Sequence, residues 1–276
     1  MIHLRKELDG GVLFEDGAGT TAFLDDEEFE KFQQALEERC EIAFEHHLIA
    51  ETGESLPLYR YASENREGQN LLREILEEVY PADEGIKVDA NTTVALASPV
   101  IVDFTVLTRC NLSCDYCYMD STAAGNDLTM EDLAVTVEEL QTAHVFQVAL
   151  GGGEPTLHPE FPRILREIRA SGAVPNYTTN GTHLTAEVLS ATKEACGAVA
   201  VSHRPSAEEA VTAAIKTFTD AGIKCNVHLL ITRDLIPHLL EVSAPYVAAG
   251  VDQVVCLLFK PIGRGRRESA SRAVSS

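Results

Sequence analysis

The run VIVDFTVLTRCNLSCDYCY, residues 100–118, joins an apolar, β-branched stretch to three closely spaced cysteines. The stretch predicts a buried β-strand, and Cys110, Cys114 and Cys117 follow it in a loop. A structural zinc site and a fully ligated [4Fe-4S] cluster each need four protein ligands, so three thiolates leave one metal position open. A zinc site completed by one of the nine histidines is the alternative.

The spacing CxxxCxxC, with Tyr116 just before the last cysteine, resembles the signature of the radical S-adenosylmethionine (radical SAM) enzymes. The resemblance implies that Cys110, Cys114 and Cys117 bind a [4Fe-4S] cluster and that S-adenosylmethionine fills the open position. It also implies reductive cleavage to a 5'-deoxyadenosyl radical, which abstracts hydrogen from a substrate, with an electron donor such as flavodoxin or ferredoxin.

Two further polar runs follow the next predicted strands, and they resemble the family's GGE(P) and TNG elements. The first is GGGEP, residues 151–155, and the second is YTTNG, residues 177–181. Functional residues of parallel α/β folds lie at the C-terminal ends of strands, where these runs are expected. The resemblance implies these contacts to S-adenosylmethionine: Tyr116, Gly152, Gly153, Glu154, Thr179, Asn180 and Ser202.

From residue 98 onward, strand-like and helix-like segments alternate six times, which predicts an α/β fold with a parallel sheet. The family resemblance implies a partial (β/α)6 TIM-like barrel over residues 98–262. Capping boxes are expected at Thr129 with Asp132 and at Ser206 with Glu209. Expected strands cover 100–107, 145–150, 174–178, 198–202, 223–231 and 251–259; expected helices cover 129–143, 159–170, 185–195, a segment opened by Ser206, and 235–249.

Residues 1–97 are interpreted as a small α+β module. Apolar residues 12–14 and 21–24 flank a glycine-containing turn, which predicts a hairpin. Asp25 is expected to cap a following helix; a strand is expected at 41–49, and a second helix at 64–79. The element order resembles winged-helix-like modules that bind leader peptides; a packing extension or dimer contact is the alternative.

Composition narrows the classes of partner. The net charge is −21, so the field of the protein repels polyanions, and neither nucleic acid nor an anionic membrane is expected as a partner. The sequence has no long apolar run and no N-terminal signal-peptide pattern, which indicates a cytoplasmic protein in a reducing compartment.

The remaining cysteines and several polar residues receive simpler interpretations. Cys40, Cys196, Cys225 and Cys256 fit no cluster spacing and are expected to be small buried hydrophobes. His203 and Arg204 are expected in a solvated loop, and His228 as a buried histidine. The basic run 260–267 resembles the segment with which peptide-modifying members leave the barrel, and its cations are candidates for holding a carboxylate; a polar basic tail is expected over 263–276.

The sequence therefore predicts a radical SAM enzyme that modifies a peptide, because of the N-terminal module and the segment after the last strand. A radical SAM enzyme of small-molecule or cofactor biosynthesis, such as haem, is the first alternative. A non-catalytic zinc or iron-sulfur binding protein is the second. No residue stands out as the partner that exchanges hydrogen with the substrate, so the catalytic residues are unknown at this stage.

Overall fold

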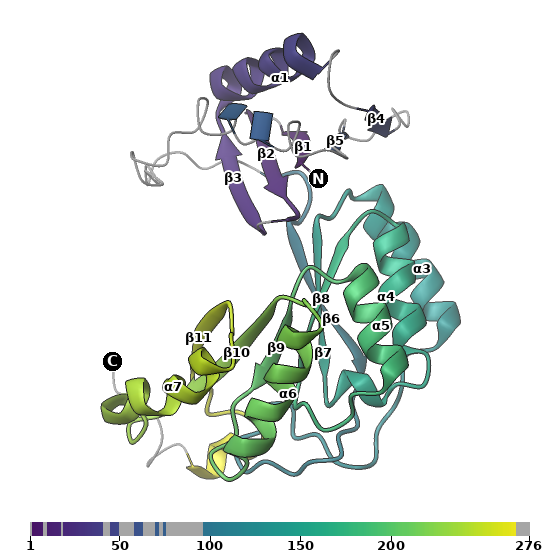
Figure 1. Cartoon of the computed structure of the whole chain (residues 1–276). Helices are drawn as coiled ribbons and strands as arrows, with labels where there is room; N and C mark the ends of the chain where they lie inside the picture. The colour runs from purple at the N-terminus through teal and green to yellow at the C-terminus, as the bar shows by residue number, and fades with distance from the viewer. Residues whose placement is uncertain are drawn as a thin grey trace. The chain divides into compact units, whose positions relative to one another are not determined.

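The computed structural model describes residues 2–7, 10–17, 19–40, 45–49, 58–62, 70–71, 74–75 and 96–268. The chain forms two compact units (Figure 1). The first contains Met1–Val100 together with Thr142–Phe146, and the second contains Ile101–Gln141 and Gln147–Ser276. The division after Val100 lies close to the expected one after residue 97, but the segment Thr142–Phe146 belongs to the first unit.

The first unit contains a five-stranded antiparallel sheet. The expected hairpin is present, and the strand expected at 41–49 is present over its second half, whereas 41–44 lie outside the described residues. The two strands that pair at the middle of the sheet were not among the elements expected from sequence. In sheet order the strands are β3 (Thr20–Leu24), β2 (Gly10–Glu15), β1 (Ile2–Glu7), β5 (Leu58–Ala62) and β4 (Glu45–Ile49).

Helix α1 (Asp26–Cys40) packs on this sheet and begins at the expected cap. The Glu28 amide donates to Asp25 Oδ1 at 2.8 Å, and the Asp25 amide donates to Glu28 Oε2 at 3.0 Å, so each residue caps the other. The apolar face of the helix, Phe29, Phe32 and Leu36, is buried in the unit's core. Of the helix expected at 64–79, residues 70–71 and 74–75 are helical and the others lie outside the described residues.

Arg5 of β1 is wholly buried and connects distant parts of the first unit. Its Nε donates to Glu7 Oε1 at 2.6 Å, and its Nη atoms donate to the carbonyls of Ser98 at 2.8 Å and His144 at 2.9 Å. Glu7 also accepts from the Ala97 amide at 2.8 Å. A buried guanidinium needs partners for its donors, and these contacts supply them.

The second unit is an α/β fold with a six-stranded parallel sheet, as expected (Figure 1). The strands follow one another in chain order across the sheet, so β6 and β11 are its two edges. The strands are β6 (Ile101–Leu107), β7 (Gln147–Gly152), β8 (Val174–Thr179), β9 (Val199–Ser202), β10 (Cys225–Ile231) and β11 (Gln253–Leu258).

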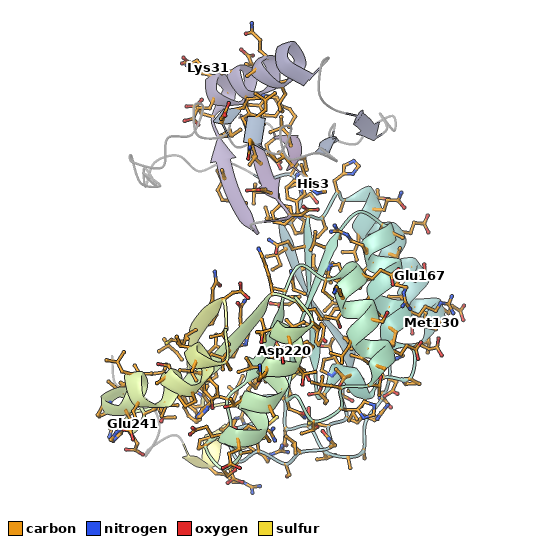
Figure 2. All side chains as sticks on the ribbon, in the orientation of Figure 1. His3, Lys31, Met130, Glu167, Asp220 and Glu241 are labelled. Carbon is orange, nitrogen blue, oxygen red and sulfur yellow. The ribbon has the colours of Figure 1, made fainter. Side chains whose placement is uncertain are left out.

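Helices between the strands cover one face of this sheet (Figure 1). Tyr177 of β8 meets Phe161 and Phe218 edge to face, at centroid distances of 5.0 Å and 6.4 Å, which anchors two of the helices to the sheet. Acidic Glu167, Asp220 and Glu241 lie on the outer surfaces of three helices (Figure 2). The helices are α3 (Met130–Thr142), α4 (Phe161–Ala170), α5 (Ala186–Ala195), α6 (Glu208–Asp220) and α7 (Leu239–Ala248).

One of the expected capping boxes is confirmed and the other is wrong. The Asp132 amide donates to Thr129 Oγ1 at 3.1 Å, as expected for the start of α3. Helix α6 begins instead at Glu208, and its N-cap residue Ala207 makes no side-chain cap. Residues 204–207 form a turn, in which the Ala207 amide donates to the Arg204 carbonyl. Ser206 therefore lies within this turn, before the first residue of the helix, and does not cap it.

Candidate functional site

The three predicted cluster cysteines lie in the loop that follows β6, and each thiol is partly exposed. Cys110 Sγ accepts the Leu112 amide at 3.4 Å and Asn180 Nδ2 at 3.8 Å. Burial raises the pKa of the Cys110 thiol, whereas the Leu112 hydrogen bond opposes that rise. The Cys117 amide donates to the Cys114 carbonyl at 3.1 Å, so the second and third cysteines share one turn.

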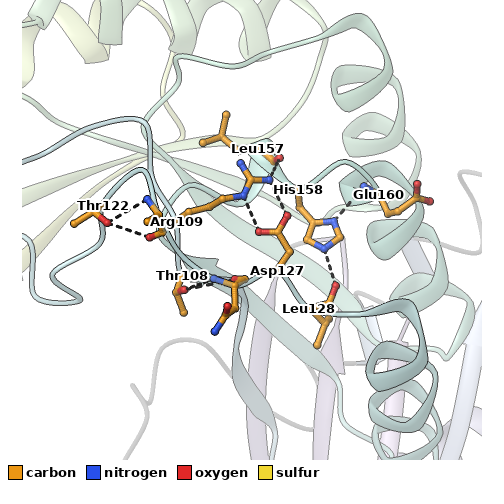
Figure 3. Close-up of polar contacts among 10 residues, drawn as sticks. Thr108, Arg109, Thr122, Asp127, Leu128, Leu157, His158 and Glu160 are labelled. Carbon is orange, nitrogen blue, oxygen red and sulfur yellow. Dashed lines mark hydrogen bonds and ion pairs between the residues drawn. The ribbon is translucent and has the colours of Figure 1, made fainter.

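An ion pair fixes the start and the end of this loop (Figure 3). Arg109 Nε and Nη2 donate to the two carboxylate oxygens of Asp127 at 2.7 Å and 2.8 Å, and Nη2 also donates to the Leu157 carbonyl at 2.6 Å. The guanidinium lowers the pKa of Asp127 through this hydrogen bond. Thr108 Oγ1 accepts the Asn126 amide at 2.9 Å beside the pair. The loop is therefore held at both ends before any ligand binds.

The glycine run at the end of β7 lies directly against the cysteine loop. A Cβ at Gly152, where φ is +127°, would lie 2.1 Å from the Leu107 carbonyl oxygen. A Cβ at Gly153 would lie 2.0 Å from the Arg109 carbonyl oxygen. The Gly153 amide donates to the Leu107 carbonyl at 3.0 Å, and the Glu154 amide donates to the Arg109 carbonyl at 3.1 Å. Only glycine allows the two backbones to approach this closely.

Glu154 places a carboxylate where β7 and β8 end, and the residue is 1% exposed. Its Oε1 accepts Thr156 Oγ1 and Thr179 Oγ1, both at 2.7 Å, and its Oε2 accepts the Asn180 amide at 2.6 Å. Asn180 in turn donates from Nδ2 to Asn111 Oδ1 at 3.0 Å. Four of the residues predicted from sequence, Cys110, Glu154, Thr179 and Asn180, are thus joined in one hydrogen-bonded network.

Two other predicted residues, Tyr116 and Ser202, lie on neighbouring segments. Tyr116 is half-buried within the cysteine loop, and Ser202 is half-buried at the end of β9, level with His228 of β10. Residues 226, 228 and 230 of β10 share one face, because alternate residues of this strand are buried against the helices. Roles for Tyr116 and Ser202 in binding a cofactor stay predictions.

The interpretation of His203 and Arg204 as a solvated loop is wrong. His203 is 6% exposed, and its Nδ1 lies 2.7 Å from Tyr246 Oη of helix α7. Burial lowers the pKa of His203 and raises that of Tyr246 to about 12. Arg204 Nε is also buried. His228 is half-buried, and burial lowers its pKa as well. His203 is buried because Tyr246 of α7 packs against it at the end of β9, and no local sequence pattern revealed this contact.

The leftover cysteines divide between buried and exposed positions. Cys225 is buried, and burial raises its pKa to about 12; Cys196 is partly buried. Cys256 is exposed, which contradicts the expectation, because β11 is an edge strand. The side chain of Cys40 lies outside the described residues.

Three residues of the site were not predicted for the contacts they make: Asn111, Thr156 and Arg264. Asn111 follows Cys110 and accepts from Asn180 Nδ2, and Thr156 lies two residues after Glu154 and donates to it, so proximity to the motifs was the available signal. Arg264 belongs to the basic run 260–267, whose cations are candidates for holding a carboxylate. It donates to the carbonyl of Cys114 at 2.8 Å and to Asp120 Oδ1 at 3.0 Å.

The donor set fits an iron-sulfur cluster, whose usual protein ligands are cysteine thiolates. Cysteines that bind a cluster attach to different irons, so their sulfurs need not converge on one point. The three partly exposed thiols lie on one loop, and the first of them accepts from the Asn180 side-chain amide, so they are available as ligands of three irons of one cluster.

Comparison with solved structures supports the same fold. The structure of Streptococcus suis SuiB bound to S-adenosylmethionine superposes with a TM-score of 0.61 at 14% identity, covering 94% of this chain and 62% of that one. Residues 104–204 match the family model of the radical SAM superfamily. This part of the chain is therefore similar to the radical SAM domain, and the enzymes of that superfamily use a [4Fe-4S] cluster and S-adenosylmethionine.

Curated relatives match about a third of the chain. The mycofactocin maturase MftC of Mycobacterium tuberculosis is 31% identical over 94 residues, 34% of this chain and 24% of the relative. A probable GTP 3',8-cyclase of Methanocella arvoryzae is 36% identical over 83 residues, 30% and 27% of the two chains. Fe-coproporphyrin III synthase of Methanosarcina barkeri is 30% identical over 98 residues, 35% and 24%. The matches thus span about a quarter of each relative's length.

None of the helices described is both long and apolar enough to span a membrane.

Proposed function

We propose that this protein is a radical SAM enzyme whose cluster is bound by Cys110, Cys114 and Cys117. The Glu154 network carries the proposal, since it joins the ends of two strands to the first of these cysteines. The bound cluster would supply one electron to cleave S-adenosylmethionine into methionine and a 5'-deoxyadenosyl radical. The chain's own residues bind and orient that cofactor.

Glu154 and the glycines before it are proposed to hold the methionyl end of S-adenosylmethionine. A carboxylate that accepts hydrogen bonds from Thr156, Thr179 and the Asn180 amide is fixed in place. A fixed negative charge attracts an ammonium group. Because Gly152 and Gly153 carry no side chains, backbone groups beside the carboxylate remain accessible to a ligand.

The substrate is proposed to be a peptide. Two comparisons support this proposal. MftC is named a maturase. A second SuiB structure is bound to the precursor peptide SuiA, and it aligns over 95% of this chain and 64% of its own, with a TM-score of 0.60 at 16% identity. The first unit offers an antiparallel sheet whose outer strands, β3 and β4, each have one unpaired side within the described sheet, and an extended peptide can add to such an edge. Leader-peptide binding by this unit is the corresponding proposal.

A small-molecule substrate is the second candidate, because the GTP cyclase and the coproporphyrin synthase match equally short parts of the chain. The face of β10 that carries Asn226 and His228 is polar enough to contact either kind of substrate. The electron donor, of flavodoxin or ferredoxin type, and the cytoplasmic location stay predictions.

The test is anaerobic reconstitution with iron and sulfide, followed by addition of dithionite and S-adenosylmethionine. About four irons per chain and release of 5'-deoxyadenosine, measured by mass spectrometry, are expected. Zinc in place of iron, or iron without the nucleoside, would show a non-catalytic metal protein. Short peptides encoded beside the gene are then added: a mass change in one of them supports the peptide substrate, and turnover of GTP or a porphyrin instead supports the alternative.

A further inference from the structure

The segment after β11 returns to the cysteine loop, although the two are far apart in sequence. The Arg264 amide donates to the Cys117 carbonyl at 3.0 Å, its Nε donates to the Cys114 carbonyl at 2.8 Å, and its Nη1 donates to Asp120 Oδ1 at 3.0 Å. One residue therefore binds the backbone of two of the three proposed cluster ligands. Its side chain is 15% exposed, so the hydrogen bond to the Cys114 carbonyl is partly shielded from water, whereas Asp120 is 65% exposed.

Gly263 makes this approach sterically feasible. Its φ is +58°, and a Cβ at this position would lie 2.4 Å from the Tyr118 carbonyl oxygen and 2.5 Å from that of Cys117. Lys260 adds a second contact, because its Nζ lies 5.6 Å from the centre of the Tyr118 ring. The contact between the two segments is thus a packed interface and does not depend on one surface ion pair.

The contact between Arg264 and the cysteine loop joins segments that follow the two edge strands of the second unit's sheet. Strands β6 and β11 are the opposite edges of the six-stranded sheet. The cysteine loop follows β6, and Arg264 follows β11, in the short helix Gly263–Glu268. The contact therefore connects the two edges at the C-terminal ends of the strands, through loops, where the candidate site lies.

We propose that Arg264 is a positioning residue that fixes the turn from Cys114 to Cys117 and raises the reduction potential of the cluster bound there. Arg264 fixes the turn because its guanidinium binds the carbonyl at one end, of Cys114, and its backbone amide binds the carbonyl at the other, of Cys117. It raises the potential because a positive charge beside a cluster stabilises the more negative, reduced form. The carboxylate of its partner Asp120 is 65% exposed, so water screens that negative charge more than it screens the guanidinium. The second part rests on the proposed function, whereas the first concerns the protein alone.

The experiment compares Arg264→Met with Arg267→Met, an exposed arginine of the same short helix. Without iron, amide hydrogen exchange is measured at Cys117 and Asp120, with helix α4 as an internal reference for global unfolding. Arg264→Met should speed exchange at both amides about tenfold or more, because hydrogen bonds from a charged donor are lost, while α4 stays unchanged. Arg267→Met should match the parent protein.

After reconstitution, the midpoint potential and the rate of iron removal by a chelator are measured. Arg264→Met should shift the potential to more negative values and release iron faster than Arg267→Met, whereas Arg264→Lys, which keeps the charge, should restore most of the potential. Equal exchange rates and equal potentials in the two methionine variants would overturn the proposal. If the parent binds no iron, the proposed function fails, and the exchange measurement still decides whether Arg264 holds the turn.

Discussion

Thr179 Oγ1 donates a hydrogen bond to Glu154 Oε1 at 2.7 Å, and this contact joins the ends of two neighbouring strands at one buried carboxylate. Neighbouring parallel strands end at the same edge of their sheet, so residues that follow them meet without a long connection. The Asn180 amide and the Cys110 thiol lie next in the same network. Its geometry makes each step of the proposed function testable by single substitutions.

Glu154→Gln should separate the charge of this residue from its shape. The amide nitrogen that replaces one oxygen faces hydroxyl and amide donors, so we expect a loss of about 1–3 kcal/mol in the free energy of unfolding. We also expect the KM for S-adenosylmethionine to rise about tenfold or more, because the charge facing the ammonium group is removed. Glu160→Gln, at an exposed position before α4, serves as the control. An unchanged KM would remove Glu154 from cofactor binding.

The glycine run offers an internal comparison between adjacent residues. A Cβ at Gly151 meets nothing within 4 Å, whereas one at Gly153 would clash with the Arg109 carbonyl. Gly151→Ala should therefore change the free energy of unfolding by less than about 1 kcal/mol, and Gly153→Ala should cost about 1–3 kcal/mol. Chemical denaturation of both variants is the measurement. Equal effects would mean that the cysteine loop does not lie against residue 153.

Cys114→Ala should abolish 5'-deoxyadenosine formation, because two thiolates do not hold a cluster with an open iron. Cys256→Ala, at an exposed position on β11, should leave product formation unchanged. Iron content and the nucleoside product are measured in both proteins after the same reconstitution. Product from the Cys114 variant, at the level of the Cys256 variant, would show that the loop is not the cluster site.

The His203 and Tyr246 pair should make stability depend on pH. Burial lowers the pKa of His203, so the unfolded chain takes up a proton there that the folded protein resists. Stability is then complete above the unfolded pKa of about 6.5 and falls as the pH drops below it. His228, whose pKa is lowered in the same direction, adds to the loss.

His203→Gln removes this titration and leaves a group that can still bond Tyr246 Oη. The loss of melting temperature between pH 7 and pH 5 should therefore be smaller in His203→Gln than in the parent protein. His238→Gln, at an exposed position, should lose as much as the parent. A parallel decline in all three proteins would exclude His203 as a source of the pH dependence.

Local sequence patterns were enough to predict the class of the second unit and most residues of the candidate site. The apolar pattern of each segment indicates which of its side chains are buried, and this depends only on neighbouring residues. The six βα units could therefore be predicted along the chain. Short motifs at strand ends marked Cys110, Glu154 and Asn180 because special backbone and side-chain chemistry is needed there. The capping box at Ser206 was wrong because tertiary packing set the start of α6 at Glu208.

Contacts between distant segments were decided by the tertiary structure alone. The burial of His203 against Tyr246 depends on how α7 packs, and the contact of Arg264 with the cysteine loop depends on the path of the chain after β11. Neither contact could be predicted from the spacing of residues along the chain, because the partners come together only when the strands pair into the sheet. The sequence thus indicated which residues are candidates for the chemistry, and the fold decided which of them touch and which segment contacts the cysteine turn.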